Sequence, residues 1–544
     1  MMARFNLSHQ NLSALHLSIA ALIVTSIGGL IRFYFILQAD FPLNDGGLFH
    51  VMIEDLQANQ FNLPKFTSYN FMDIPYAYSP LPFYLAGLLN NWLGWSLVDI
   101  LRILPAIIST LAIPVFFILS IEILDSHDQA ILATIAYALM LPAFEWLVMG
   151  GGLTRSLANL FSLGALYFTI VSIKTKNTHM SISAGIFLGL TAVSHQEIAM
   201  VTLASTALFF IFLTKSRREF GRLVLIWGIA GVVTFPYFIS VASMHGITPF
   251  ISAFQAGEFE LVRIITKFIS LSYTGEIYYT PFTVIAFLGL WGCLAEKKYL
   301  LPTWLLVVTI INPRSVERTA MLPVALLIGY GLDQMILPAL GRLTKFSQRP
   351  GSSYLKVGTN LDSNLGLMPK HGIGIAFLVV LFFQAGTLLM LINHGNERLT
   401  PVPTQERAAM NWVSQNTPSS SSFMVLTNSS NWASDKSAEW FPVLSKRHSV
   451  NTAQGLEWLP GGKFNQAQQD IEELKDCMFD DVACLENWSD STGRTFTHIF
   501  LSRNESEQHC GYPCSLPIEQ SLRNSSHYRL LFDNKMAAVL EKVE

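Results

Sequence analysis

The segment Leu223-Val-Leu-Ile-Trp-Gly-Ile-Ala-Gly-Val-Val-Thr-Phe-Pro-Tyr-Phe-Ile-Ser-Val-Ala-Ser243 contains no charged residue. An α-helix needs about 20 mostly apolar residues to cross the hydrocarbon core of a bilayer, so this segment is long enough to span a membrane. Similar segments recur along the chain and together predict about eleven transmembrane helices. The predicted spans are residues 14–37, 98–121, 129–148, 153–173, 181–194, 198–213, 223–243, 281–295, 299–311, 320–340 and 372–392.

The composition of the whole chain agrees with a membrane protein. Of its 544 residues, 51% are hydrophobic and 13% are charged, whereas soluble proteins carry about 25% charged residues. This composition excludes an intrinsically disordered protein. Lys and Arg number 35 against 38 Asp and Glu, so no basic excess is present to neutralise nucleic-acid phosphates. We therefore expect an α-helical polytopic membrane protein.

The apolar pattern ends near residue 393, which divides the chain into two domains. Residues 1–393 are predicted to form the transmembrane domain, and the more polar residues 394–544 to form a water-soluble domain. In that second part, residues 403–415 are typical of a helix and residues 422–427 of a strand, which predicts a mixed α/β domain. Cys293 lies in an apolar segment, where a small core residue is expected.

Positive charges predict the topology, because Lys and Arg are enriched in cytoplasmic loops. The loops rich in Lys and Arg are residues 174–176, 215–222, 296–298 and 342–370. Placing them in the cytoplasm puts the N-terminus inside and residues 394–544 outside an integral plasma membrane protein. The first loop, residues 38–97, then lies outside, and its apolar part 80–95 is expected to dip into or lie on the outer leaflet. The loops at 149–155, 195–197, 245–280 and 312–318 face the same side.

The first external loop begins with Asp40-Phe-Pro-Leu-Asn-Asp45-Gly-Gly. One interpretation makes Asp45 the N-cap of an amphipathic surface helix that starts at Gly46. The other makes Asp45 functional, because carboxylates at a membrane edge are costly to place. Asp40, His50 and Glu54 are then expected to support it. The triple glycine at 150–152 lacks the context of a phosphate-binding loop and is expected to allow a close approach of this loop to the bundle.

Several features of the first loop resemble the GT-C superfamily of polytopic glycosyltransferases, which includes aminoarabinose transferases, protein O-mannosyltransferases and oligosaccharyltransferase catalytic subunits. These features are Asp45, the amphipathic helix, Ile74-Pro-Tyr-Ala-Tyr-Ser-Pro-Leu-Pro-Phe-Tyr84 and Leu101-Arg-Ile-Leu-Pro105. The segment Arg407-Ala-Ala-Met-Asn-Trp412-Val-Ser-Gln-Asn-Thr-Pro418 is similar to the start of the extracytoplasmic domain in several members.

The resemblance implies a polyprenyl-phosphate sugar donor and makes Asp45 the general base or a carboxylate close to a metal. Members often have an acidic pair where this chain has Asn44-Asp45. Whether a divalent metal is a cofactor is left open.

Sugar transfer from a lipid phosphate leaves a phosphate whose growing charge needs cations. Arg is well suited, because its planar guanidinium matches phosphate oxygens. On the predicted outer face these cations are Arg155, Arg314 and Arg318. The alternatives are that Arg155 is a snorkelling anchor at the interface, and that Arg314 or Arg318 simply pairs with Glu317.

His195 and Glu197 lie at the turn of a helical hairpin whose two halves are short for membrane spans. Such interrupted helices expose polar groups where a membrane protein needs a cavity, so both residues are expected to support the site. Alternatively, their side chains only satisfy the turn. Asp, His and Glu sets can also hold a divalent metal, although no spacing here matches a known metal motif.

The soluble domain offers aromatic residues beside acids and amides at 435–442 and 454–462, a composition that suits either sugar binding or core packing. Four cysteines, Cys477, Cys484, Cys510 and Cys514, are expected to form two local disulfides outside the cytoplasm. Three pairings are possible, and zinc binding is the lesser alternative.

The leading hypothesis is an inverting membrane glycosyltransferase with a polyprenyl-phosphate sugar donor and a glycan, lipid or protein acceptor. The alternatives are a transporter or flippase of a lipid-linked or polar solute and a non-catalytic protein of envelope assembly.

Overall fold

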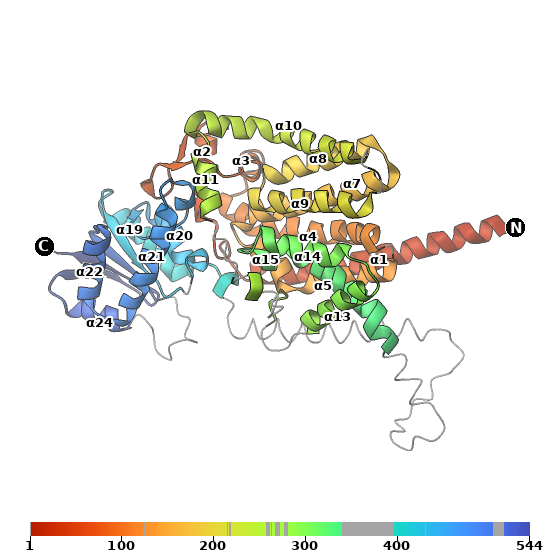
Figure 1. The fold of residues 1–544 in the computed structure, drawn as a ribbon. Helices are drawn as coiled ribbons and strands as arrows, with labels where there is room; N and C mark the ends of the chain where they lie inside the picture. The colour runs from red at the N-terminus through yellow and green to blue at the C-terminus, as the bar shows by residue number, and fades with distance from the viewer. Residues whose placement is uncertain are drawn as a thin grey trace, which may run out of the picture.

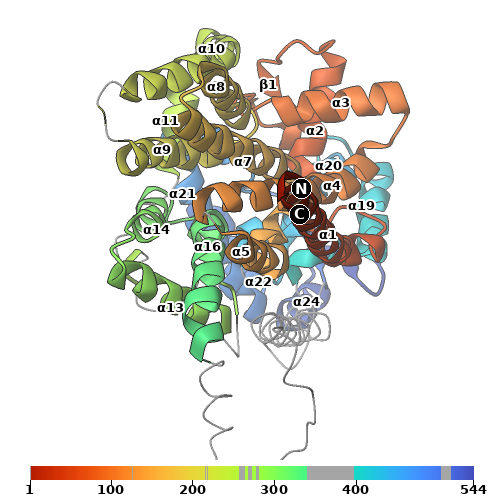
Figure 2. The ribbon, with the colours of Figure 1, turned by 90° about the vertical axis from the view of Figure 1, so that its right-hand side faces the viewer.

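The computed structural model describes residues 2–124, 126–214, 216, 219–256, 262, 264–266, 273–276, 281–339, 397–429, 431–503 and 516–543. A bundle of apolar helices forms one part of the molecule and a domain built around a β-sheet forms the other (Figure 1). The sheet domain lies at one end of the bundle, opposite the start of α1 (Met2–Leu37). Figure 2 looks along the bundle from the end where α1 begins.

The protein is a multi-pass membrane protein by the length and composition of its helices. Six described helices are long and apolar enough to cross a bilayer. They lie in α1, α4 (Leu97–Leu124), α7 (Gly152–Thr175), α9 (Gln196–Leu213), α10 (Phe220–His245) and the helix that starts with α16 (Met321–Gly331) and continues through the π-helical turn η4 (Leu332–Ile336). The shorter apolar helices α8 (Thr178–Ala192), α13 (Pro281–Ala295) and α14 (Leu300–Ile311) match three other predicted spans. The predicted span 372–392 lies outside the described residues, and the count of eleven stays a prediction.

The predicted span 129–148 is a bent pair of helices in the structure, and it adds a seventh candidate span if the pair is counted as one. Helix α5 (His127–Leu139) ends before the 3-10 turn η2 (Leu141–Ala143) and the short helix α6 (Glu145–Val148), and the chain bends there by 85°. Pro142 supplies the local cause, because proline has no N–H to donate to the carbonyl oxygen of Ala138, four residues earlier, as a continuous helix would require. The guanidinium of Arg32, buried in α1, donates to the carbonyl oxygen of Ala138 at 2.8 Å and so satisfies the end of α5.

Glycines allow α8 and α10 to pack closely. A Cβ atom on Gly185 would lie 2.7 Å from the carbonyl oxygen of Ile226, and one on Gly189 would lie 2.6 Å from the Val233 side chain. Small residues four apart commonly bring membrane helices together in this way. The opposite face of α10 exposes Val232 and Phe235, as expected of a helix in contact with lipid.

The first loop folds between the bundle and the sheet domain. It contains α2 (Gly47–Ala58), the short strands β1 (Phe66–Thr67) and β2 (Ile74–Pro75), a 3-10 turn η1 (Tyr69–Phe71), and α3 (Leu81–Leu93). Helix α3 falls within the segment 80–95 that was expected to dip into or lie on the membrane. Its 13 residues are too few to cross a bilayer, and Trp92 near its end is exposed.

The C-terminal part is built on a five-stranded sheet with the order β4-β3-β5-β7-β6. The strands are β3 (Ser422–Leu426), β4 (His448–Ser449), β5 (His498–Ser502), β6 (Tyr528–Asp533) and β7 (Ala537–Lys542). The pairs β3–β4 and β3–β5 are parallel, whereas β7 is antiparallel to β5 and β6. The predicted helix 403–415 and strand 422–427 correspond to α19 (Thr404–Asn416) and β3.

Helices cover both faces of this sheet. Along β3, the side chains of Phe423 and Val425 pack with α19 and α20 (Lys436–Ser445), whereas Met424 and Leu426 pack on the other side. Helices α21 (Lys463–Asp476), α22 (Val482–Thr492) and α24 (Leu516–Asn524) cover that second side. The alternation along β3 follows from the two-residue period of a strand.

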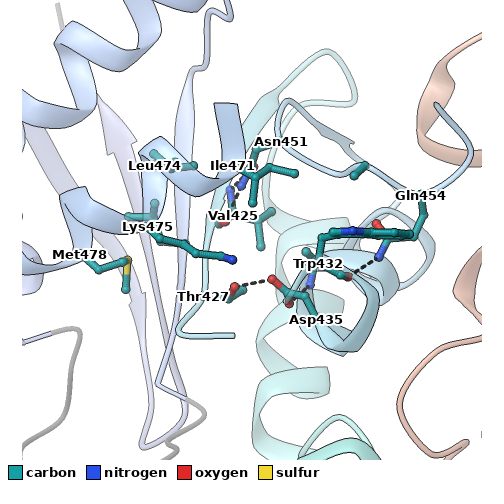
Figure 3. A pocket seen from close by; sticks show the side chains of 13 residues that line it. Val425, Thr427, Trp432, Asp435, Asn451, Gln454, Ile471, Leu474, Lys475 and Met478 are labelled. Atoms are coloured by element: carbon teal, nitrogen blue, oxygen red, sulfur yellow. Dashed lines mark hydrogen bonds between the residues drawn. The ribbon is translucent and has the colours of Figure 1, made fainter. Parts of the chain in front are cut away.

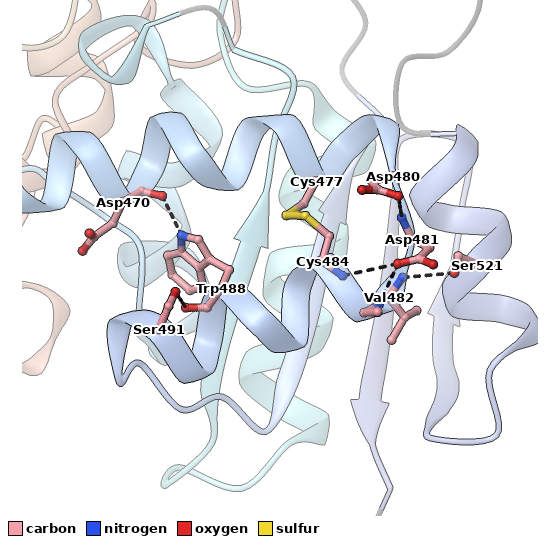
Figure 4. The surroundings of a disulfide bond; sticks show 10 residues. Asp470, Cys477, Asp480, Asp481, Val482, Cys484, Trp488, Ser491 and Ser521 are labelled. Atoms are coloured by element: carbon pink, nitrogen blue, oxygen red, sulfur yellow. Dashed lines mark hydrogen bonds between the residues drawn. A yellow bond between two sulfur atoms is a disulfide. The ribbon is translucent and has the colours of Figure 1, made fainter.

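A disulfide between Cys477 and Cys484 joins the end of α21 to α22 (Figure 4). This bond confirms one of the expected local pairs, and the zinc alternative is wrong for these two residues. The carboxylate of Asp481 caps α22 by accepting from the backbone nitrogens of Ala483 and Cys484. Cys510 and Cys514 lie outside the described residues. Cys293 is a free, buried cysteine, as predicted.

Candidate active site

Asp45 lies in the loop that follows α1 and is almost fully buried, with 7% of its surface exposed. Its Oδ2 accepts a hydrogen bond from Nη2 of Arg155 at 2.8 Å, and its Oδ1 accepts one from the backbone nitrogen of Gly151 at 2.8 Å. The interpretation of Asp45 as the N-cap of the next helix is wrong. Helix α2 begins at Gly47, and its cap position is Gly46, which has a φ of 121°.

The triple glycine explains how the bundle reaches this carboxylate. A Cβ atom on Gly151 would lie 2.5 Å from Oδ2 of Asp45, and one on Gly150 would lie 2.1 Å from its carbonyl oxygen. Any side chain at these positions would therefore displace the Asp45 loop. The expected close approach of this loop is confirmed.

Arg155, in the first turn of α7, is held in place by the preceding segment. Its Nη1 donates to the carbonyl oxygen of Trp146, and its guanidinium lies 5.2 Å from the centre of the Trp146 ring. The side chain is 15% exposed and paired with Asp45. The alternative of a snorkelling anchor is wrong, because the guanidinium points into the protein and not to an interface.

The sheet domain contacts the Asp45 loop from the other side. Oε1 of Glu439 in α20 accepts hydrogen bonds from the backbone nitrogens of Gly46 at 2.9 Å and Leu48 at 3.3 Å. These are the N–H groups that a helix start leaves without an intrahelical partner. Nε1 of Trp440 donates to the carbonyl oxygen of Asn44 at 3.0 Å. Burial raises the pKa of Glu439, and the negative charge of Asp45 raises it further.

A second buried ion pair lies near the first. Nη2 of Arg318 donates to Oε2 of Glu197 at 2.9 Å, so the carboxylate that pairs with Arg318 comes from the helical hairpin and not from the neighbouring Glu317. Arg314 places its guanidinium 5.7 Å from the ring centre of Trp432, in the sheet domain. Both arginines enter the site from the short loop between α14 and α16.

His195 and Tyr78 connect the two ion pairs. Burial lowers the pKa of His195 to about 3, and the positive charges of Arg318 and Arg155 act in the same direction. The ring centres of His195 and Tyr78 are 6.2 Å apart. Burial also raises the pKa of Tyr78 to about 12, which the charge of Arg155 partly opposes. Neutral side chains therefore separate the two arginines.

The structure thus brings together six predicted site residues, namely Asp45, Arg155, His195, Glu197, Arg314 and Arg318. Three others pair with side chains other than Asp45, and their supporting role stays a prediction. Asp40 pairs with Arg407 of the sheet domain. His50 and Glu54 face each other at 3.5 Å on α2, because residues four apart share one side of a helix.

A resident divalent metal does not fit the described side chains. In this part of the chain, no group of three or more His, Cys, Asp or Glu side chains is placed to hold a metal ion. Both oxygens of Asp45 already accept hydrogen bonds, from Arg155 and Gly151.

A small pocket opens at the carboxyl ends of β3 and β4 in the sheet domain (Figure 3). Its polar side chains already have protein partners: the Thr427 hydroxyl donates to Asp435, and the Gln454 amide donates to the backbone carbonyl oxygen of Trp432 at 3.0 Å. The segment 435–442 was expected either to bind sugars or to pack in the core. Its Trp440 is fully buried in the core.

Sequence reasoning did not assign Tyr78 or Glu439 to the site. Tyr78 stood within the Tyr- and Pro-rich segment of the first loop, which was a usable signal. Glu439 stood within the segment 435–442, but nothing in the sequence placed it beside Gly46, which lies 393 positions away.

No protein-family model matches the sequence, and a search of curated proteins finds no relative. Solved structures do match. The oligosaccharyltransferase of Archaeoglobus fulgidus in its apo form superposes with a TM-score of 0.52 at 13% identity, covering 94% of this chain and 73% of that one. ArnT from Cupriavidus metallidurans bound to undecaprenyl phosphate gives 0.52 at 13% identity, covering 95% and 97%.

The arabinofuranosyltransferase AftD from Mycobacteria gives a TM-score of 0.52 at 12% identity, covering 96% of this chain and 40% of that one. Identities this low carry the fold alone. The chain therefore shares the fold of these three solved structures.

Proposed function

We propose that this protein is a membrane glycosyltransferase that moves a sugar from a polyprenyl-phosphate carrier to an acceptor, with inversion at the anomeric carbon. The observation that carries the proposal is the buried Asp45–Arg155 pair beside Arg318 and His195 in a GT-C fold. The undecaprenyl phosphate bound to ArnT, whose fold this chain shares, supports a lipid phosphate as the donor carrier.

In the proposed reaction Asp45 is the general base. The carboxylate takes the proton of the acceptor hydroxyl as the acceptor oxygen attacks the anomeric carbon. The bond between that carbon and the phosphate oxygen breaks, and its electron pair leaves with the lipid phosphate. Because one displacement occurs, the configuration at the anomeric carbon inverts.

The arginines stabilise the leaving phosphate. Preorganised cations in a site that excludes water stabilise developing charge far better than they would in bulk solvent. Arg155 and Arg318 are buried around the rings of Tyr78 and His195, and Arg314 enters from the same loop as Arg318. Arg155 serves twice, since its Nη2 also donates a hydrogen bond to Oδ2 of Asp45.

We place this site on the outer face of a plasma membrane, with residues 1–393 as the membrane domain and 394–544 as an extracytoplasmic domain. The distribution of Lys and Arg supports a cytoplasmic N-terminus. The Cys477–Cys484 disulfide supports an oxidising compartment for the sheet domain. That domain and the site lie at the same end of the bundle (Figure 1).

Transfer by the purified protein tests the proposal. The donors are undecaprenyl phosphates that each carry one labelled pentose or hexose, and the readout is release of undecaprenyl phosphate with label in an acceptor or in water. We expect Asp45→Asn to lower the rate by about 100-fold or more. Asp40→Asn is the matched control, because Asp40 lies on the same loop but is exposed and pairs with Arg407. Equal rates for wild type and Asp45→Asn would refute the role of Asp45.

A further inference from the structure

Four buried polar atoms without a hydrogen-bond partner lie in the region where the sheet domain meets the candidate site. Across the described residues, Nε1 of Trp458, Oε2 of Glu457, Nδ1 of His195 and Nε of Arg318 belong to this class. Each such atom costs about 1–3 kcal/mol when it is left unpaired, and native proteins leave few of them. Their gathering in one region indicates that a polar ligand completes the hydrogen bonds.

Tyr78 connects the residues that carry these atoms. Its ring centre is 5.5 Å from that of Trp458 and 6.2 Å from that of His195. Trp458 is only 6% exposed, in the 3-10 turn η7 (Leu456–Trp458). Arg314 is close enough for its charge to act on both Glu457 and His195.

The unpaired atoms of Glu457 and Trp458 have complementary chemistry. The indole N–H can only donate a hydrogen bond, and a carboxylate oxygen can only accept one. A hydroxyl group both donates and accepts, so sugar hydroxyls can satisfy the two side chains together. Burial raises the pKa of Glu457, and the charge of Arg314 partly opposes this effect.

Arg318, which lies near these residues, can bind the phosphate of such a ligand. Arg318 keeps its Nε unpaired although Nη2 donates to Glu197. Binding sites commonly combine apolar and aromatic walls with a few convergent polar groups, and Tyr78 and Trp458 supply such walls here. The pocket of Figure 3 differs, because its Thr427 and Gln454 side chains already donate to protein acceptors.

We infer that Glu457 and Trp458, beside Tyr78, form the subsite for the sugar of a sugar-phosphate ligand whose phosphate lies toward Arg314 and Arg318. This inference rests on the proposed function and adds the residues that select the sugar. A site built to bond a hydroxyl rejects analogues that lack it, because its own buried groups then stay unpaired.

Binding to the purified full-length protein in lipid nanodiscs tests the inference with two kinds of probe. One is bare undecaprenyl phosphate, and the other is undecaprenyl phosphate that carries one pentose or hexose, used as a small panel. We expect Trp458→Phe to weaken binding of the best sugar-bearing lipid about three- to tenfold, and Glu457→Gln about tenfold. Neither should change binding of the bare lipid, whereas Arg318→Met should weaken both.

Trp488→Phe is the matched control. Nε1 of Trp488 donates to the carbonyl oxygen of Asp470 at 2.6 Å (Figure 4), whereas Nε1 of Trp458 has no protein partner among the described residues. Trp488→Phe should therefore lower the melting temperature and leave lipid binding unchanged. Trp458→Phe should leave the melting temperature nearly unchanged and weaken binding of the sugar-bearing lipid.

The outcomes separate this inference from the proposed function. If the wild type binds neither lipid, the lipid-phosphate function itself fails, and if Arg318→Met changes the binding of neither lipid, the placement of the phosphate at Arg318 fails. If the wild type binds both lipids but Trp458→Phe and Glu457→Gln affect both equally, or neither, the sugar subsite is wrong while the phosphate site stands. The sugar subsite is also refuted if the wild type binds no sugar-bearing lipid of the panel more tightly than the bare lipid.

Discussion

Oε1 of Glu439 lies 2.9 Å from the backbone nitrogen of Gly46, the residue directly after Asp45. One side chain of the sheet domain thus caps the first helix of the external loop. Trp440 holds the residue before Asp45 through the carbonyl oxygen of Asn44. Two adjacent residues of α20 therefore hold the loop on both sides of the proposed base, Asp45.

The variants Glu439→Gln and Glu439→Ala should distinguish the effect of the capping hydrogen bonds of Glu439 from the effect of its charge. Glutamine keeps the acceptor oxygen, so the cap of α2 should survive, whereas alanine should expose the amides of Gly46 and Leu48 to hydrogen exchange. Loss of a cap costs about 1 kcal/mol, and a displaced Asp45 should also slow transfer at least tenfold. Unchanged exchange at these amides in Glu439→Ala would contradict the capping role.

The pH dependence of the Glu439 contact has a defined sign. Its pKa is raised in the folded protein by burial and by the charge of Asp45, so the folded state holds this proton more tightly than the unfolded chain does. Below the ordinary pKa of glutamate, the side chain is protonated in both the folded and the unfolded state, and its contribution to the stability of the fold is favourable. As the pH rises toward the raised pKa, stability should fall. In thermal melts, the loss of stability with rising pH should be smaller in Glu439→Gln than in the wild type. Parallel stability profiles for the two proteins would contradict this prediction.

Gly151→Ala should disrupt the site because its added methyl group would collide with the side chain of Asp45. The new methyl group would lie 2.5 Å from Oδ2 of Asp45, so the carboxylate must move away from Arg155. We expect a loss of about 1–3 kcal/mol in stability and a fall in transfer rate comparable to that of Asp45→Asn. Gly228→Ala in α10 is the control, because a Cβ atom there meets nothing within 4 Å. Normal activity in Gly151→Ala would show that the close approach of Gly151 to Asp45 is not needed for sugar transfer.

Reduction of the Cys477–Cys484 disulfide should destabilise the sheet domain without altering the site. The bond closes a short loop with a sequence separation of 7, for which the loop-entropy relation gives about 2 kcal/mol. The melting temperature should drop on addition of a reductant, and binding of undecaprenyl phosphate below that temperature should stay constant. The double variant Cys477→Ala, Cys484→Ala should reproduce the drop and make the protein insensitive to reductant.

The sequence located the site better than it located the contacts within the site. Asp45, Arg155 and Arg318 could be found because charged residues are conspicuous in an apolar chain, and because loop charges assign them to one face. The N-cap interpretation of Asp45 failed because it considered only local acceptors, while Glu439 supplies an equivalent oxygen from far along the chain. The break after α5 had a visible signal in Pro142, which hydropathy alone does not weigh.

The Arg318–Glu197 pair gives the most direct test of the phosphate site, because its two members should have opposite effects. Glu197 is an anion that occupies Nη2 of Arg318 at 2.9 Å, so it competes with a phosphate for the same guanidinium. Glu197→Gln should therefore bind bare undecaprenyl phosphate several-fold more tightly than the wild type, whereas Arg318→Met should bind it about tenfold more weakly.

In the double variant the gain should vanish, since no cation remains at this position for the phosphate to occupy. Non-additivity of this kind is the signature of residues that act through one contact. The tighter binding by Glu197→Gln should also weaken as salt is raised, because it depends on a charge that solvent ions can screen. Equal effects of both single variants on binding would mean that the pair only fixes the loop between α14 and α16 against the hairpin, and the phosphate would then have to be assigned to Arg155 and Arg314.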